Sequence, residues 1–194
     1  MDYVILDELK KLRRIATSDT VDDESLQRAV NAANQLIDGR CGRTFGLADT
    51  ATGRVFRPRG RVLSDPDGER LLVDDIGHPD GLVVDVGDGA AWTPVTDYDL
   101  LPDNAHAKGE PVTGLLRPYG TWAGRKVRVT ARWGWPTVPD DIRQAALLLA
   151  SRLWLRRDSP EGVAGATEWG VVRVSRLDPD VESLISPYVL PGFA

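Results

Sequence analysis

The chain has 194 residues and a mass of 21.2 kDa, which is enough for one domain or for one domain with an insertion. Hydrophobic residues make up 42% of it and charged residues 27%, near the globular average, which argues against a wholly disordered chain. The net charge of −5 argues against a protein that coats nucleic acid by bulk attraction, and no run of about 18 apolar residues suggests a membrane span.

Two helices are predicted near the start. Apolar residues recur with a period near three over residues 6–15, and turn formers at 17–20 end that helix. Acids at 22–24 suit the positive end of a helix dipole, and apolar residues then keep helical spacing over four turns to Cys41. Residues 1–8 show no basic or long apolar region, so we expect no signal peptide and a soluble protein made inside the cell.

Residues 50–136 change character, because short runs of β-prone residues alternate with turn formers. The runs lie at residues 54–56, 70–73, 82–86, 92–95 and 126–133, and the turn formers at 65–68, 79–81 and 87–89. This spacing predicts an antiparallel meander or a small barrel-like sheet. The run 126–133 alternates polar and apolar residues, so one of its faces should be in water.

A long helix and a tail follow. Thr137 supplies a capping hydroxyl and Pro139 a proline for the first turn of a helix that runs from Ile142 to about Arg157. This helix is apolar almost all round, so it is either central to the core or shared with a neighbouring subunit. The tail predicts a loop at 158–170, a strand at 171–177, a short helix capped at 178–180 and an apolar end.

These patterns predict an α+β fold. We expect a small bundle of three main helices, a strand-rich insertion between the second and the long third helix, and an extended C-terminal arm. The segments are the N-terminal core helices (1–49), the insertion (50–136), the long core helix (137–157) and the arm (158–194).

Charge is strongly segregated along the chain. From Arg40 to Arg61 there are six arginines and one acid, from residue 62 to 107 eleven acids and one base, and from 112 to 139 five bases and no acid. The blocks can be solvated loop charges, or they can be complementary surfaces of a head-to-tail interface between subunits. The sequence leaves both interpretations open.

Little in the sequence favours catalysis. His78 and His106 fall in a turn and a loop, without a nucleophile at a recognisable motif position, and Cys41 lies on an apolar helix face. One cysteine and two histidines leave almost nothing for a soft-metal site, and no glycine-rich phosphate loop is present. We therefore expect no enzyme activity, cofactor or metal.

Tryptophan supports an alternative. There are six tryptophans, and Trp133 and Trp135 flank Gly134, where they can pack in the core or stack on single-stranded nucleic acid. The alternative function is a nucleic-acid-binding module that uses the basic stretch from Arg40 to Arg61 and the Trp-bearing sheet.

A series of phrases, in order over nearly the whole chain, resembles the head-to-tail connector (adaptor) proteins of long-tailed bacteriophages, especially those of actinobacteria. The phrases are Leu6-Asp7-Glu8-Leu9-Lys10, Asp22-Asp23, Leu36-Ile37-Asp38, Tyr98-Asp99-Leu100-Leu101-Pro102-Asp103-Asn104-Ala105, Val127-Arg128-Val129-Thr130-Ala131-Arg132-Trp133-Gly134-Trp135-Pro136, Val138-Pro139-Asp140-Asp141-Ile142-Arg143-Gln144-Ala145-Ala146 and Arg156-Arg157. Smaller members of the family are bare helical bundles, so the insertion at 50–136 departs from the family pattern.

The resemblance implies a structural virion protein without catalysis, made in the bacterial host cytoplasm and located in the neck between head and tail. Such proteins form a dodecameric ring under the portal protein, extend the DNA channel and present a surface to the next tail-proximal connector or stopper protein. Double-stranded DNA passes through the lumen without specific binding, and no membrane is involved.

The same resemblance directs attention to the arm and to the charged segments. The residues assigned to partner binding are Trp169, Val172, Arg173, Val174, Arg176, Leu177, Tyr188 and Phe193. The residues assigned to the subunit interface are Arg152, Arg156, Arg57, Arg59, Asp74 and Asp75.

Overall fold

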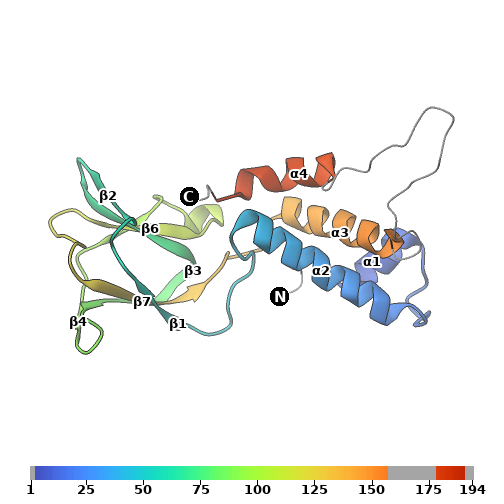
Figure 1. Ribbon diagram of the computed structural model, residues 1–194, viewed down its shortest axis with the longest axis horizontal. Coiled ribbons are helices and arrows are strands. Elements are labelled where there is room, and N and C mark those ends of the chain that lie inside the picture. The colour runs from blue at the N-terminus through green and yellow to red at the C-terminus, as the bar shows by residue number, and fades with distance from the viewer. Residues whose placement is uncertain (1–2, 157–177, 191–194) are drawn as a thin grey trace. The chain divides into compact units, whose positions relative to one another are not determined.

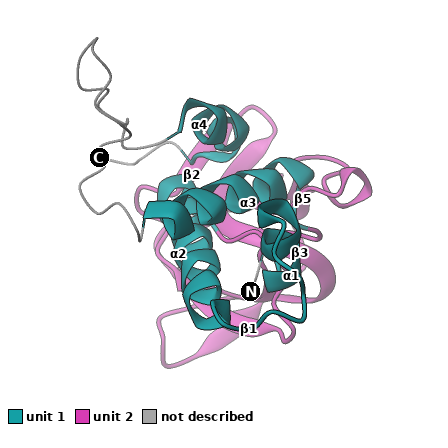
Figure 2. Cartoon of the chain, turned by 90° about the vertical axis from the view of Figure 1, so that its right-hand side faces the viewer, with its two compact units in different colours: residues 1–43, 138–194 teal, residues 44–137 magenta. Residues whose placement is uncertain are grey.

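The computed structural model describes residues 3–156 and 178–190. The chain forms two compact units (Figure 2): unit 1, residues 1–43 and 138–194, is helical, and unit 2, residues 44–137, holds the sheet. The predicted α+β class is confirmed, because a seven-stranded antiparallel sheet stands in the sequence between α2 and α3. Among the described residues, no helix combines the length and apolar character needed to cross a membrane.

The described residues of unit 1 form the three main helices that were expected and the short helix that was predicted in the arm. They are α1 (Leu6–Arg13), α2 (Asp23–Cys41), α3 (Asp140–Leu155) and α4 (Pro179–Ile185), and the 3-10 turn η3 (Ser186–Tyr188) follows α4. The helix α2 packs against α3, α1 against both, and α4 against α3 (Figure 1). Ala145, Ala146 and Ala150 of α3 are fully buried, and such small side chains let neighbouring helices approach closely. The helix α3 is therefore central to the core of unit 1, one of the two roles that its composition allowed.

The helix ends differ partly from the sequence prediction. The expected cap at Thr137 is wrong: Pro139, with an extended backbone (φ −60°, ψ 146°), is the N-cap residue of α3, and no side chain caps it. The short helix α4 begins as predicted, with the carboxylate of Asp178 accepting a hydrogen bond from the backbone N–H of Asp180. Gly42 ends α2 at φ +68°, a conformation that favours glycine.

The sheet of unit 2 is organised around one long strand. Its strands are β1 (Thr52–Phe56), β2 (Val62–Asp65), β3 (Gly68–Gly87), β4 (Trp92–Pro94), β5 (Asp99–Leu101), β6 (Val112–Arg117) and β7 (Lys126–Trp133), with the 3-10 turn η1 (His106–Lys108) after β5. The main order is β1-β7-β3-β6-β5, while β2 and β4 pair with β3 outside that path. The first half of β3 pairs with β2 and β6, and the second half with β4 and β7.

The turn predicted at residues 79–81 is wrong. This segment lies inside β3, which joins the two runs predicted at 70–73 and 82–86, and the register with β7 shifts on both sides of His78. Pro79 has no N–H to donate and Gly81 has φ +75°, so the ladder is interrupted there. The strand bulges but does not reverse, because Val83 resumes pairing with β7.

The sheet encloses its own core. The strand β7 alternates buried and half-buried residues along its whole length, so the predicted wet face is confirmed. The buried cluster includes Phe56, Leu71, Ile76, Leu115, Trp122 and Val127. Gly134 has φ +107°, and a Cβ there would lie 1.8 Å from the carbonyl oxygen of Gly46, so only glycine fits this crossing of two segments.

Candidate functional site

Most residues predicted to bind partners lie outside the described part of the chain. They are Trp169, Val172, Arg173, Val174, Arg176, Leu177 and Phe193. Tyr188 is described: it is half-buried, and its hydroxyl donates a hydrogen bond to Asp141 at 3.2 Å. Burial, and then the neighbouring Asp141 carboxylate, raise the pKa of the Tyr188 phenol.

Polar contacts attach the segment 178–190 to the rest of unit 1. The backbone N–H of Leu190 donates to the carbonyl oxygen of Cys41 at 2.9 Å, at the end of α2. Arg152 of α3 forms an ion pair with Asp178, and Arg40 of α2 forms one with Glu182. Two helices of unit 1 thus contact this segment: α2, through Cys41 and Arg40, and α3, through Asp141 and Arg152.

The six residues predicted at a subunit interface fall into two groups. Arg57, Arg59 and Arg156 are exposed. The other three have partners within the chain: Arg152 has Asp178, Asp74 contacts Arg54 at 2.8 Å and Arg61 at 3.5 Å, and Asp75 accepts a hydrogen bond from the indole N–H of Trp135 at 3.1 Å. Asp75 is only 8% exposed, so its carboxylate has little surface to offer another subunit. Arg152 and Arg156 belong to unit 1, and the other four residues belong to unit 2.

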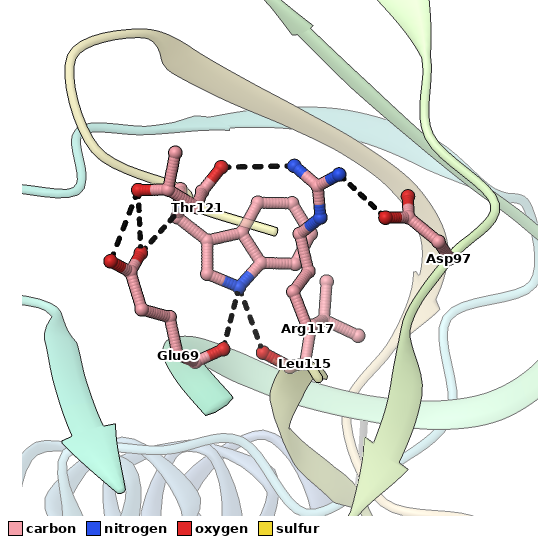
Figure 3. A network of polar contacts seen from close by, with 6 residues as sticks. Glu69, Asp97, Leu115, Arg117 and Thr121 are labelled. Carbon is pink, nitrogen blue, oxygen red and sulfur yellow. Dashed lines mark hydrogen bonds and ion pairs between the residues drawn. The ribbon is translucent and has the colours of Figure 1, made fainter. Parts of the chain in front are cut away.

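A further polar network fixes the loop between β6 and β7 (Figure 3). The buried indole N–H of Trp122 donates to the carbonyl oxygens of Glu69 and Leu115, and the Glu69 carboxylate accepts hydrogen bonds from the backbone N–H of Trp122 and the hydroxyl of Thr121. The Arg117 guanidinium lies over the Trp122 ring at 5.3 Å and donates to Asp97 at 2.6 Å.

Arg117 also lowers the pKa of its partner, Asp97. This hydrogen bond is the main reason that the pKa of the Asp97 carboxyl lies below its ordinary value. Asp97 is therefore paired within the chain, like Asp74 and Asp85, the last of which forms an ion pair with Arg128 at 2.8 Å.

The described tryptophans of the sheet unit do not offer the stacking surface that the nucleic-acid alternative needs. Trp122, Trp133 and Trp135 are between 1% and 8% exposed, and the guanidinium of Arg128 lies 4.6 Å from the centre of the Trp92 ring. A base cannot stack on a ring that is covered by the protein's own core or by an arginine. The three buried rings instead pack in the core, which is the other role considered for the tryptophans.

The side chains that could be reactive are Cys41, His78 and His106, and each is buried or in contact with neighbouring residues. Cys41 is fully buried, and burial raises the pKa of its thiol to about 11, which disfavours the nucleophilic thiolate. His78 and His106, separate in sequence, form an edge-to-face ring contact at 4.7 Å, and His78 accepts a hydrogen bond from the backbone N–H of Asp80. In the described part of the chain, no group of three or more His, Cys, Asp and Glu side chains is placed to hold a metal ion.

Comparison with family models and with curated proteins finds no match. Among solved structures, the chain is similar to one in the neck of an empty gene transfer agent (GTA) particle, computed with C6 symmetry: the TM-score is 0.55 at 20% identity over 97% of this chain and 90% of that one. It is also similar to a chain of the native GTA virion, with a TM-score of 0.51 at 20% identity over 97% and 89% of the two chains. The likeness shows a shared fold that includes both units.

Proposed function

We propose that this protein is a structural component of a phage-like particle, a head-to-tail connector that sits in the neck under the portal. The observation that carries the proposal is the fold similarity to a neck chain over 97% of the sequence. It covers the sheet unit as well as the helices, so the insertion at 50–136, absent from the smaller connectors, has a counterpart in a neck protein. The role is mechanical and needs no catalytic group.

The connector acts as a ring. The GTA neck was computed with C6 symmetry, which supports copies arranged around an axis. A closed ring needs a heterologous interface, in which two different surfaces of one subunit meet the matching surfaces of its neighbours. Twelve subunits is the number that the family resemblance implies. The ring extends the DNA channel, and the negative charge of each subunit lets DNA pass without binding.

The C-terminal segment supplies the contact with partners. Trp169 and Arg173 are residue types enriched in protein-binding hot spots, and Val172 and Leu177 add apolar surface beside them. This segment contacts the portal protein on one side of the ring, and the opposite side presents a surface to the next tail-proximal protein.

Assembly with the portal protein of the same genome tests the function. The purified chain is mixed with the portal, and the products are separated by velocity sedimentation and imaged by electron microscopy. We expect a ring that co-sediments with the portal. If no ring forms and no portal complex is seen at any protein concentration tested, the connector function is wrong.

A variant of the C-terminal segment tests its role separately. Trp169→Ala together with Arg173→Ala changes no residue of α1 to α4, and we expect the helical unit to keep its circular dichroism spectrum while portal binding falls at least tenfold. The matched control is Arg28→Ala, an exposed arginine on α2, which should bind like the wild type. Equal binding by all three proteins would remove the segment from the portal contact.

A further inference from the structure

Ion pairs inside unit 2 leave two sets of charge without partners. The carboxylates of Asp74, Asp85 and Asp97 are paired within the chain. By contrast, four aspartates at one place and two arginines at another have neither a hydrogen bond nor an ion pair from their side chains within the described residues. The four aspartates are Asp65, Asp67, Asp99 and Asp103, and the two arginines are Arg57 and Arg59.

The four aspartates line one hollow, which we call the acidic hollow. Asp65 and Asp67 come from the β2–β3 turn, and Asp99 and Asp103 from β5 and the residues after it. Strand register brings them together, because β3 pairs with β2 and with β6, and Asp99 of β5 lies opposite Leu116 of β6. The hollow has a volume of about 820 Å³, and Leu100, Leu101 and Leu116 are among its apolar lining residues.

The acidic hollow is not neutralised by any cation among the described residues. All four aspartates are exposed, and no lysine or arginine is among the described residues that line it. The carboxylates are not arranged as a metal site in the part of the chain that the structure describes. Four like charges over an apolar floor favour a partner that brings positive charge on side chains with some apolar surface.

The two arginines stand on a fixed turn, residues 57–61, which we call the arginine loop. Arg54 before it and Arg61 at its end are both held by Asp74. The backbone N–H groups of Arg61 and Val62 donate to the carbonyl oxygen of Pro58 at 2.8 and 3.1 Å. Arg57 and Arg59 are therefore exposed on a loop whose ends are anchored, and a preorganised loop loses little entropy when it binds.

We propose that the arginine loop of one subunit docks in the acidic hollow of the next subunit. The inference rests on the proposed ring. A guanidinium group matches one carboxylate with two parallel hydrogen bonds and has further N–H donors for a second, so two arginines can engage four carboxylates. The arginine stems can cover the leucines. Because the loop and the hollow are different surfaces of the same unit, their contact repeats from copy to copy, as a closed ring requires.

Charge reversal with mixing tests the docking. The loop variant is Arg57→Glu with Arg59→Glu, and the hollow variant is Asp65→Lys with Asp99→Lys, which changes exposed strand residues. Each variant alone should need at least a tenfold higher concentration to form the ring, by velocity sedimentation. An equimolar mixture should recover the wild-type assembly, and so should one chain that carries all four changes. In the mixture each arginine loop meets an unchanged acidic hollow, and each glutamate loop meets the two introduced lysines.

The control separates this contact from general charge attraction. Lys108→Glu with Arg125→Glu changes the net charge as the loop variant does, at two exposed residues outside the loop, and should assemble like the wild type. Normal assembly by the loop or hollow variant would overturn the proposal, and so would failure of both the mixture and the four-change chain to assemble. A loop variant that assembles normally but loses affinity for DNA would assign the loop to nucleic acid instead.

Cross-linking covers the case in which the ring forms only on the portal. In a Cys41→Ala background, Arg59→Cys and Asp99→Cys chains are mixed and oxidised with the portal present. A disulfide-linked heterodimer that forms in the mixture and not with either chain alone supports the contact. A ring without the heterodimer overturns the docking and leaves the connector function standing, whereas absence of any ring or portal complex overturns both.

Discussion

The helical unit and the sheet unit use their charged side chains differently. In unit 1, Lys10, Arg40 and Arg152 form ion pairs that hold one element to another within the chain. In unit 2, ion pairs such as that of Asp85 and Arg128 lie between paired strands, and the arginine loop and the acidic hollow keep their charges unpaired. The same types of residue therefore serve internal cohesion in one unit and remain available for assembly in the other.

This difference follows from the architecture. Packed helices bury their apolar faces against each other, so a charge near the contact must find a partner in the same unit. A sheet with long turns exposes many charged residues at strand ends without cost, and those residues can be used for contacts between copies. Four changes test the comparison.

The largest effect should come from the core of the sheet unit, by Trp122→Ala. The indole is 1% exposed and its N–H donates to two carbonyl groups, so we expect a loss of about 3–5 kcal/mol in the free energy of unfolding. Urea titration followed by tryptophan fluorescence measures it. Trp122→Phe keeps one aromatic ring and loses the N–H donor and part of the packing, so it should cost less, about 1–2 kcal/mol. If alanine and phenylalanine cost the same, the ring's packing contributes nothing.

The second change addresses cohesion in the helical unit, by Lys10→Met. The ammonium group is buried, donates to the carbonyl oxygen of Asp19 at 2.8 Å and forms an ion pair with Asp23. Methionine fills similar space but leaves these oxygens unpaired, which should cost about 2 kcal/mol by urea titration followed at 222 nm. Lys11→Met, at the exposed neighbouring residue, is the control and should change stability by less than about 0.5 kcal/mol.

The residues that set local structure were largely readable from the sequence. The spacing that ends at Cys41 predicted α2, and the alternation at 126–133 predicted β7. The strands β2, β5 and β6 were missed, because Gly114 interrupts the apolar run of β6 and such short strands depend on their partners: β2 and β6 pair with β3, and β5 pairs with β6. The bulge at Pro79 was taken for a turn because its local chemistry is that of a turn.

The charged surfaces were predictable only in outline. Segregation of charge along the chain pointed to complementary surfaces, but Asp74 and Asp75 are engaged by Arg54 and Trp135, which are distant in sequence. The acidic hollow was missed for the same reason, since strand register alone brings the β2–β3 turn beside β5. Which charges remain unpaired is a property of tertiary contacts, and one sequence does not contain it.

The third change releases α4, by Arg152→Gln. Its partner Asp178 is the N-cap residue of α4, and both side chains are about 30% exposed, so loss of the pair should cost only about 1 kcal/mol. Faster amide hydrogen exchange in residues 179–188, with exchange in β7 unchanged, is the expected result. Arg40→Gln breaks the more exposed pair with Glu182 and should have a smaller effect. Equal amide exchange in both variants would mean that the lower exposure of the Arg152–Asp178 pair does not make it more stabilising than the Arg40–Glu182 pair.

The fourth change should have the smallest effect on stability. It concerns the Cys41 thiol, and the difference from the wild type appears only at alkaline pH. Burial raises its pKa from 9.0 to about 11, so the folded state keeps the proton more tightly than the unfolded state. Stability from this group is fully present below pH 9 and is lost as the pH rises toward 11, because only the unfolded thiol ionises freely there. Tyrosines and lysines titrate in the same range, so the measurement is the difference between the wild type and Cys41→Ala in urea titrations from pH 7 to 11. The wild type should lose more stability than the variant above pH 9, and parallel curves would show that the thiol meets water in the folded helical unit.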